Sequence, residues 1–128
     1  MTIGESRTVS TQVDGHNTAA AVHSGSVEVF ATPMMIALME RAASELAERF
    51  LEPTQTTVGT GIEVSHTAAT PVGMRVEATA TLTDVKGRLL TFSVCASDEH
   101  GPIGEGIQQR MIVDRQHFIQ RAENRRIK

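Results

Sequence analysis

The feature that most constrains this chain is a change of hydrophobic period near its middle. Residues 32–50 (TPMMIALMERAASELAERF) place apolar side chains every three to four residues, which is typical of an amphipathic helix. After Pro53, residues 56–66 (TTVGTGIEVSH) alternate in steps of two, which is typical of a half-buried strand. The order predicts one long helix packed against a strand, and the rest of the chain must complete that pair.

Further strand patterns surround this pair. We expect strands at residues 8–13, 74–85, around 90–96 and at 103–113, with a hairpin turn at residues 86–88 and a short helix after Asp114 through Arg121. One helix wrapped by an antiparallel sheet of about five strands is an α+β architecture. We expect one domain over residues 1–128 with loose ends at 1–7 and 122–128. Because such a sheet has open edges and a half-covered face, we also expect a homodimer.

The pattern also assigns faces to the helix and to the strand that follows it. Thr32-Pro33 predicts the helix start, with Thr32 as N-cap. Strict alternation predicts that Gly59 and Gly61 lie on the outer face of the strand. The residues expected to face the core are Met35, Leu38, Met39, Ala42, Ala43, Leu46 and Phe50 from the helix, and Val58, Thr60, Ile62, Val64 and His66 from the strand.

Composition and charge exclude several function classes. Twelve Lys and Arg against 15 Asp and Glu give a net charge of −3, which disfavours nucleic acid and anionic membranes, although a small phosphorylated ligand can still meet a local Lys or Arg. The N-terminus lacks a signal-peptide pattern, and no apolar run reaches the ~20 residues that span a bilayer, so we expect a cytoplasmic protein. Cys95 is the single cysteine and the histidines lack ligand spacing, so we expect neither a disulfide nor a metal site.

Three residues of the helix and strand form the candidate catalytic set: Thr32, Glu40 and His66. Each has a structural alternative, namely a helix cap for Thr32, an ordinary edge charge for Glu40 and a strand-end imidazole bonded to backbone for His66. The functional interpretation is that a hydroxyl, a carboxylate and an imidazole point into one helix–strand interface. Such a set can supply a nucleophile or a general base and can move protons.

Other candidates are less specific. Gly59 and Gly61 indicate either a β-bulge or a place where a ligand approaches the backbone. Arg110 on the last strand is either a solvated charge or a contact for phosphate or carboxylate. We expect Phe30 and Met35, beside the helix start, to line a substrate pocket, since methionine suits a short or adaptable chain. The loop at residues 14–26 is long enough to act as a lid.

Two stretches carry a resemblance to a known family. ATPMMIALMERAA, followed by QTTVGTGIEVSHTAATPVG, resembles the fluoroacetyl-CoA thioesterase-like family of the hotdog-fold superfamily, over roughly residues 8–118. The resemblance implies a hotdog fold, a dimer with sites near its interface, and action on an acyl-CoA thioester, with coenzyme A present only as part of the substrate. It implies catalytic roles for Thr32, Glu40 and His66, and substrate contacts for Gly59 and Arg110.

The resemblance also marks a difference and leaves alternatives. The fluoroacetyl-specific member carries phenylalanines in the loop before the helix, whereas residues 23–26 here are His-Ser-Gly-Ser and no aromatic residue precedes Phe30. A hotdog hydratase or dehydratase acting on acyl-CoA, with the same histidine and a carboxylate, is a second hypothesis. A module that binds acyl-CoA without turnover is a third.

Overall fold

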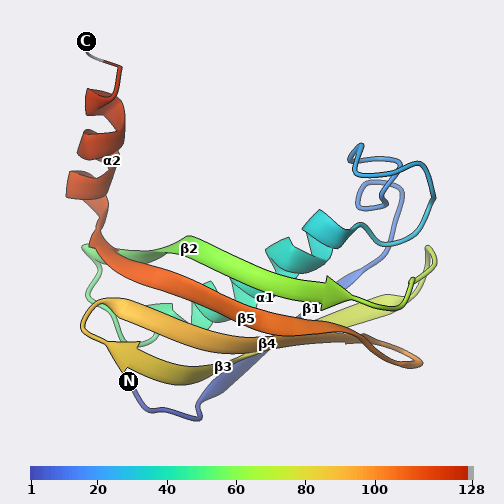
Figure 1. Ribbon diagram of the computed structural model, residues 1–128, viewed down its shortest axis with the longest axis horizontal. Coiled ribbons are helices and arrows are strands. Elements are labelled where there is room, and N and C mark those ends of the chain that lie inside the picture. The colour runs from blue at the N-terminus through green and yellow to red at the C-terminus, as the bar shows by residue number, and fades with distance from the viewer. Residues whose placement is uncertain (127–128) are drawn as a thin grey trace.

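In the computed structural model, which describes residues 1–126, one long helix lies against one face of a five-stranded antiparallel sheet (Figure 1). The sheet order is β1-β3-β4-β5-β2, so β1 and β2 are the edge strands. The strands are β1 (Ser6–Gln12), β2 (Gln55–His66), β3 (Arg75–Lys86), β4 (Leu89–Asp98) and β5 (Gly101–Asp114), and the helices are α1 (Thr32–Glu48) and α2 (Arg115–Asn124). The predicted α+β architecture is confirmed, and no strand end differs from its predicted position by more than two residues.

The core lies between α1 and the facing side of the sheet. The predicted helix stripe is buried as far as Leu46, but Phe50 lies beyond the helix end and is 38% exposed. Alternation along β3 and β4 supplies the opposing layer, as the period of two requires. Its buried members are Val76, Ala78, Ala80, Leu82, Leu90, Phe92, Val94 and Ala96.

The start of α1 differs from the prediction. Ala31, and not Thr32, occupies the N-cap position, and no side chain caps the helix. Thr32 is the first helical residue, and its hydroxyl instead forms a hydrogen bond with the His66 ring. The helix still begins where Pro33 favours it, because proline fixes a helical φ and lacks the N–H that would have no partner there. The N-cap assignment was therefore wrong, while the position of the helix start was right to one residue.

A β-bulge in β2 changes which side chains face the helix. Gly59 is opposite Arg110 and Gly61 is opposite Gln109, so Thr60 is the extra residue. Thr57 and Gly59 therefore face α1 before the bulge, and Ile62, Val64 and His66 face it after the bulge. The predicted facing was correct for Ile62, Val64 and His66, which follow the bulge, and for the outward-facing Gly61. It was wrong for Val58, Thr60 and Gly59, because strict alternation ignores an inserted residue.

The last helix, α2, projects from the body of the molecule. Asp114 caps α2, because its Oδ1 accepts the His117 backbone N–H at 3.0 Å, as the sequence predicted. The helix extends past the expected end at Arg121 to Asn124. At its base, Arg115 donates to the Glu48 carboxylate at 2.8 Å and to the Pro53 carbonyl at 3.1 Å. These contacts fix the angle at which α2 projects (Figure 1).

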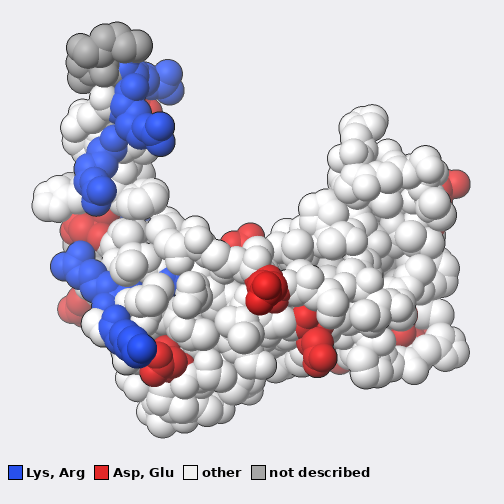
Figure 2. All heavy atoms as spheres, in the orientation of Figure 1, with Lys and Arg blue, Asp and Glu red and all other residues white. Residues whose placement is uncertain are grey.

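The loop between β1 and α1 projects at the opposite end. Its backbone is fixed by isolated bridges between Thr18 and Phe30 and between Val29 and Pro71. Both projections rise on the side of β2, and the surface between them is hollowed (Figures 1 and 2). Within residues 1–126, neither helix has the length and apolar character needed to cross a membrane.

Candidate active site

Thr32 and His66 form a direct pair at the N-terminal end of α1. Thr32 Oγ1 lies 2.8 Å from His66 Nδ1, and the tautomer of the ring decides which atom donates. Thr32 is exposed, whereas His66 is half-buried at the last position of β2. The pair joins the first turn of the helix to the end of the edge strand, so the fold fixes the ring orientation from two sides.

The other nitrogen of His66 has a different environment. Nε2 is buried, and no group within residues 1–126 makes a hydrogen bond with it. Burial lowers the pKa of the His66 imidazole below its ordinary 6.5, and the nearby Ala68 backbone offsets part of that shift. The neutral ring is therefore favoured at neutral pH, and residues 1–126 leave the hydrogen-bonding capacity of Nε2 unused.

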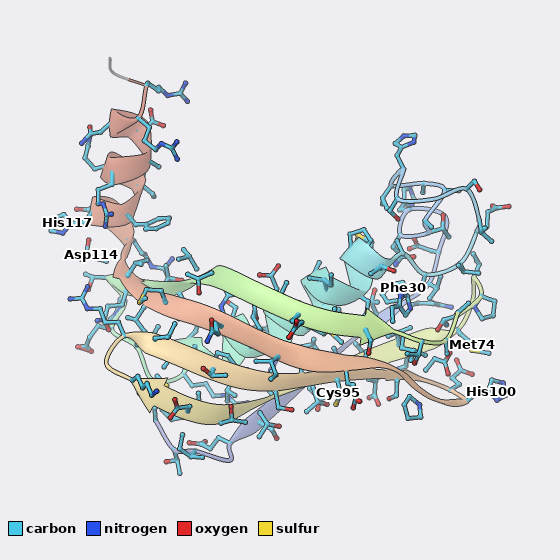
Figure 3. The ribbon with its side chains drawn as sticks, in the orientation of Figure 1. Phe30, Met74, Cys95, His100, Asp114 and His117 are labelled. Carbon is cyan, nitrogen blue, oxygen red and sulfur yellow. The ribbon has the colours of Figure 1, made fainter. Side chains whose placement is uncertain are left out.

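A small cavity opens beside this pair. Its volume is about 210 Å³ and it lies between the β1–α1 loop, the start of α1 and the end of β2. Phe30 lies beside the start of α1 below that loop (Figure 3) and is 1% exposed. The cavity is lined by Ala19, Ser24, Val29, Phe30, Thr32, His66, Ala68 and Ala69. Small and apolar walls with two hydroxyls, from Ser24 and Thr32, and one imidazole suit a short apolar group with a polar end.

Glu40 lies two turns further along α1 in a second polar group. Its Oε2 accepts a hydrogen bond from Gln108 Nε2 at 2.7 Å and another from Arg110 Nη1 at 3.3 Å. Both donors come from β5 and both use the same oxygen. The Glu40 side chain is 41% exposed. One carboxylate oxygen is therefore held in place, which leaves Oε1 without a hydrogen bond from the described part of the chain.

Arg110 is buried under β2 and is not the solvated charge that the pattern favoured. Its side chain is 8% exposed, its Nε donates to Thr57 Oγ1 at 2.8 Å and its Nη2 to the Thr57 carbonyl at 3.2 Å. Burial lowers the pKa of the guanidinium, and the charge of Glu40 opposes that shift. Arginine stays charged at neutral pH, so Arg110 supplies a fixed positive charge beside the carboxylate.

Gly59 allows this group to lie against the backbone of β2. A Cβ at this position would lie 2.5 Å from Glu40 Oε2 and 3.1 Å from Gln108 Nε2. No larger residue fits unless the carboxylate moves. Of the two explanations offered for a glycine here, the structure contains the bulge, and the group that lies closest to Gly59 is the Glu40 carboxylate of the same chain.

The three candidate residues are not gathered at one point within a single chain. Thr32 pairs with His66, while Glu40 pairs with Gln108 and Arg110, and eight residues of helix place Thr32 about 12 Å from Glu40 along the axis. The donors to Glu40 are on β5, and Thr32 is not one of them. Met35 is fully buried and packs under Gly104, and it is not among the residues that line the cavity beside His66.

Gln108 is the site residue that sequence reasoning missed. It is 1% exposed, and its Oε1 is a buried acceptor with no donor in residues 1–126. An amide on a strand has no distinctive spacing, so the pattern alone does not single it out. The sequence signal that could have found it is its spacing from Arg110. Gln108 and Arg110 are two residues apart on one strand, so they share the face toward α1, while their neighbours are exposed.

Comparison with solved structures defines the class. A hot-dog-like protein from Thermanaerovibrio acidaminovorans matches with a TM-score of 0.87 at 26% identity, covering 96% of this chain and 91% of that one. A Thermus thermophilus hypothetical protein of the thioesterase superfamily also gives 0.87, at 28% identity over 97% of this chain and 94% of that one. The fold is therefore the hotdog fold, as the resemblance implied.

Closer matches define the family. The family model described as FlK, fluoroacetyl-CoA-specific thioesterase, matches residues 13–116. The fluoroacetyl-CoA thioesterase of Streptantibioticus cattleyicolor is 39% identical, covering 92% of this chain and 89% of that protein. A T42A mutant of the fluoroacetyl-CoA thioesterase FlK in complex with fluoroacetate matches with a TM-score of 0.92 at 35% identity, over 98% of both chains. The chain belongs to the fluoroacetyl-CoA-specific thioesterase family.

Proposed function

We propose that this protein hydrolyses small acyl-CoA thioesters, and that Thr32, Glu40 and His66 carry the reaction. The observation that supports this most directly is the Glu40 carboxylate. Gln108 and Arg110 hold one of its oxygens, while the side chain stays partly open to solvent. A carboxylate held in this way is suited to attack a carbonyl carbon or to take a proton from water.

Two balanced routes use the same carboxylate. In one, Glu40 attacks the thioester carbonyl, the C–S bond breaks with release of the CoA thiolate, and water then hydrolyses the acyl–glutamyl anhydride. In the other, Glu40 takes a proton from water, the hydroxide attacks the carbonyl, and the thiolate leaves directly. In both, the thiolate gains a proton to give free CoA, and the net change consumes one water. In either route the Glu40 carboxylate reacts through an oxygen atom, and Arg110 Nη1 lies 3.3 Å from its Oε2.

His66 and Thr32 act at the acyl end of the substrate. Neutral His66 presents Nε2 toward bound substrate, where it can exchange a proton or donate to the carbonyl oxygen. Thr32 fixes the ring through Nδ1. Phe30 borders the same cavity and limits the size of the acyl group. The volume of about 210 Å³ suits a small acyl group, and acetyl-CoA and fluoroacetyl-CoA are therefore the first esters to test.

We further propose a cytoplasmic homodimer that pairs through the β2 edges. β2 is an open edge strand, and Ile62 on its helix-facing side is 37% exposed. Antiparallel pairing around a two-fold axis reverses the second strand, so the Glu40 group of each chain would lie toward the Thr32–His66 end of the other. This arrangement would bring together the groups that one chain keeps apart. Light scattering coupled to size exclusion measures the mass, and a monomer that turns over at the full rate contradicts this arrangement.

The test of the function is release of free thiol from a panel of acetyl-, fluoroacetyl-, branched short-chain and aromatic CoA esters. We expect turnover of at least one small ester by the wild type and a loss of about 10³-fold in kcat for Glu40→Gln. Glutamine keeps the size of the side chain and removes its charge. Thermal unfolding of each variant serves as the control for folding.

Two outcomes contradict the proposal. If Glu40→Gln and His66→Ala both leave hydrolysis unchanged, the catalytic roles are wrong. If the wild type binds CoA esters and releases no thiol from any of them, the protein is not a thioesterase. A parallel assay with enoyl-CoA esters then distinguishes a hydratase from a binding module.

A further inference from the structure

Three arginines near the far end of the sheet form no ion pair with any carboxylate of residues 1–126. Arg88 lies in the turn between β3 and β4, and Arg121 and Arg125 lie on α2. Among residues 1–126, no Asp or Glu is within ion-pair distance of any of the three. Figure 2 shows Lys and Arg gathered along α2 and the end of the sheet below it. On a chain of net charge −3, such a group is a local positive surface.

These arginines border two adjoining cavities at the junction of β5 and α2. The first, of about 280 Å³, is lined by Arg88, Val113, Asp114, His117, Phe118, Gln120 and Arg121. The second, of about 370 Å³, is lined by Phe118, Arg121, Ala122 and Arg125. Phe118 and Arg121 line both cavities, and Phe118 is 39% exposed. We call this region the C-terminal cleft.

The one carboxylate in the lining is already engaged. Asp114 Oδ1 accepts the backbone N–H of His117 as the cap of α2, and the two residues mark the base of that helix in Figure 3. Arg115, the next residue, is likewise neutralised by Glu48. The three arginines of the cleft therefore outnumber its one carboxylate, and the lining keeps a net positive charge.

The chemistry of the cleft matches a phosphorylated nucleotide. An exposed aromatic ring offers a stacking surface for a base, and arginine donates paired hydrogen bonds to phosphate. Gln120 adds an amide that can meet a base edge or a ribose. Coenzyme A ends in such a group, an adenosine that carries a 3′-phosphate and a 5′-diphosphate.

The position of the cleft agrees with that ligand. Val113 lines the cleft, and Arg110 of the Glu40 group is three residues earlier on β5, about 10 Å along the strand. The pantetheine arm of CoA, fully extended, is longer than this. We infer that the C-terminal cleft, through Phe118, Arg88 and Arg121, binds the 3′-phosphoadenosine end of the CoA thioester. This inference rests on the proposed function and adds a binding site for the non-reacting end of the substrate.

The direct test is a calorimetric titration of the full chain with adenosine 3′,5′-bisphosphate. We expect binding by the wild type that weakens about tenfold in the Arg88→Gln/Arg121→Gln double variant and about tenfold in Phe118→Ala. Arg75→Gln is the matched control, because it removes an exposed charge from the other end of β3, and we expect unchanged affinity. Raised salt should weaken wild-type binding more than that of the double variant.

A kinetic test separates this site from the reacting groups. The double variant should raise KM about tenfold for the acyl-CoA while kcat and the KM for the matching acyl-pantetheine stay at wild-type values, because pantetheine lacks the nucleotide. Equal KM changes for both thioesters, or unchanged bisphosphate binding, would overturn the inference. A change in oligomeric mass in place of nucleotide affinity would also overturn it, since the cleft would then hold a second copy. Absence of turnover in the wild type counts against the proposed function alone.

Discussion

At the start of α1, Thr32 and His66 form an uncharged pair 2.8 Å apart, whereas two turns later Glu40 is a carboxylate held by an amide and a guanidinium. The first group is selected for neutrality, because burial lowers the pKa of His66. The second group contains a charged partner, because the buried Arg110 guanidinium lies 3.3 Å from the carboxylate. The contrast teaches that one helix can hold an imidazole–hydroxyl pair and a carboxylate–guanidinium group apart, each in its own electrostatic environment.

Gly59→Ala is the variant expected to disturb the Glu40 group most while leaving the Thr32–His66 pair unchanged. A Cβ here occupies the space of Glu40 Oε2, and because that atom ends a flexible side chain, the carboxylate moves at little cost in stability. We expect kcat for acyl-CoA to fall about 100-fold, as a displacement near 1 Å can cause. Thermal unfolding should change little. A variant that keeps the wild-type rate would show that the position of Glu40 is not critical.

Gln108→Met tests the donor that sequence analysis overlooked. Methionine has nearly the same length, so it removes the 2.7 Å hydrogen bond to Glu40 and leaves the packing largely intact. A hydrogen bond to a charged group is worth about 1.5–3 kcal/mol, so we expect kcat to drop about tenfold or more. Gln108→Glu provides a second measurement, since a like charge beside Glu40 should reduce the rate further. Equal rates for wild type and both variants would place Gln108 outside the catalytic machinery.

Thr32→Val tests the uncharged group in the same way. Valine keeps the shape of threonine but removes the partner of His66 Nδ1, at a typical cost near 1 kcal/mol, which corresponds to about a fivefold lower rate. Thr32→Ser should restore the rate because it keeps the hydroxyl. The double variant Thr32→Val/Gln108→Met completes the cycle. If its loss of rate differs from the product of the two single losses, the two groups act together on one substrate.

The smallest expected effect is on pH dependence. Because burial lowers the His66 pKa below 6.5, the ring stays neutral in the folded protein where the unfolded chain takes up a proton. His66 therefore contributes stability above pH 6.5 that is lost as the pH falls through the lowered value. We expect kcat/KM to be level near neutral pH and to decline on the acid side of 6.5. The decline due to this group should vanish in His66→Asn, measured by initial rates across pH.

Periodicity predicted the strong features of the fold because they come from many residues at once. The stripe on α1 and the alternation of β3 and β4 are each repeated over several turns or steps, so one exception does not change the result. Even the cap of α2 was predictable, since Asp114 sits directly before the helix. The family resemblance then added the hotdog topology, which no local pattern specifies.

The details of the site depend on single residues and on pairing across the sheet, and these were not predictable. The bulge at Thr60 arises from how β2 pairs with β5, and it reverses the face of Gly59. The burial of Arg110 depends on Thr57 from the neighbouring strand, which supplies two acceptors. Thr32 lost its expected capping role because His66, 34 residues away, offered its hydroxyl another partner. Each correction comes from a contact between distant segments.

The bulge also bears on how this enzyme can change over time. In a strand that alternates without interruption, all inward side chains depend on the same pairing register. A shift of that register by one residue therefore turns every one of them outward. The inserted Thr60 divides β2 into two halves of opposite parity, one beneath Glu40 and one ending at His66. Deleting Thr60 would invert one half and leave the other in place. The two halves of β2 can therefore change in sequence independently. Substitutions near His66 can reshape the acyl pocket while the backbone beneath Glu40 keeps its position.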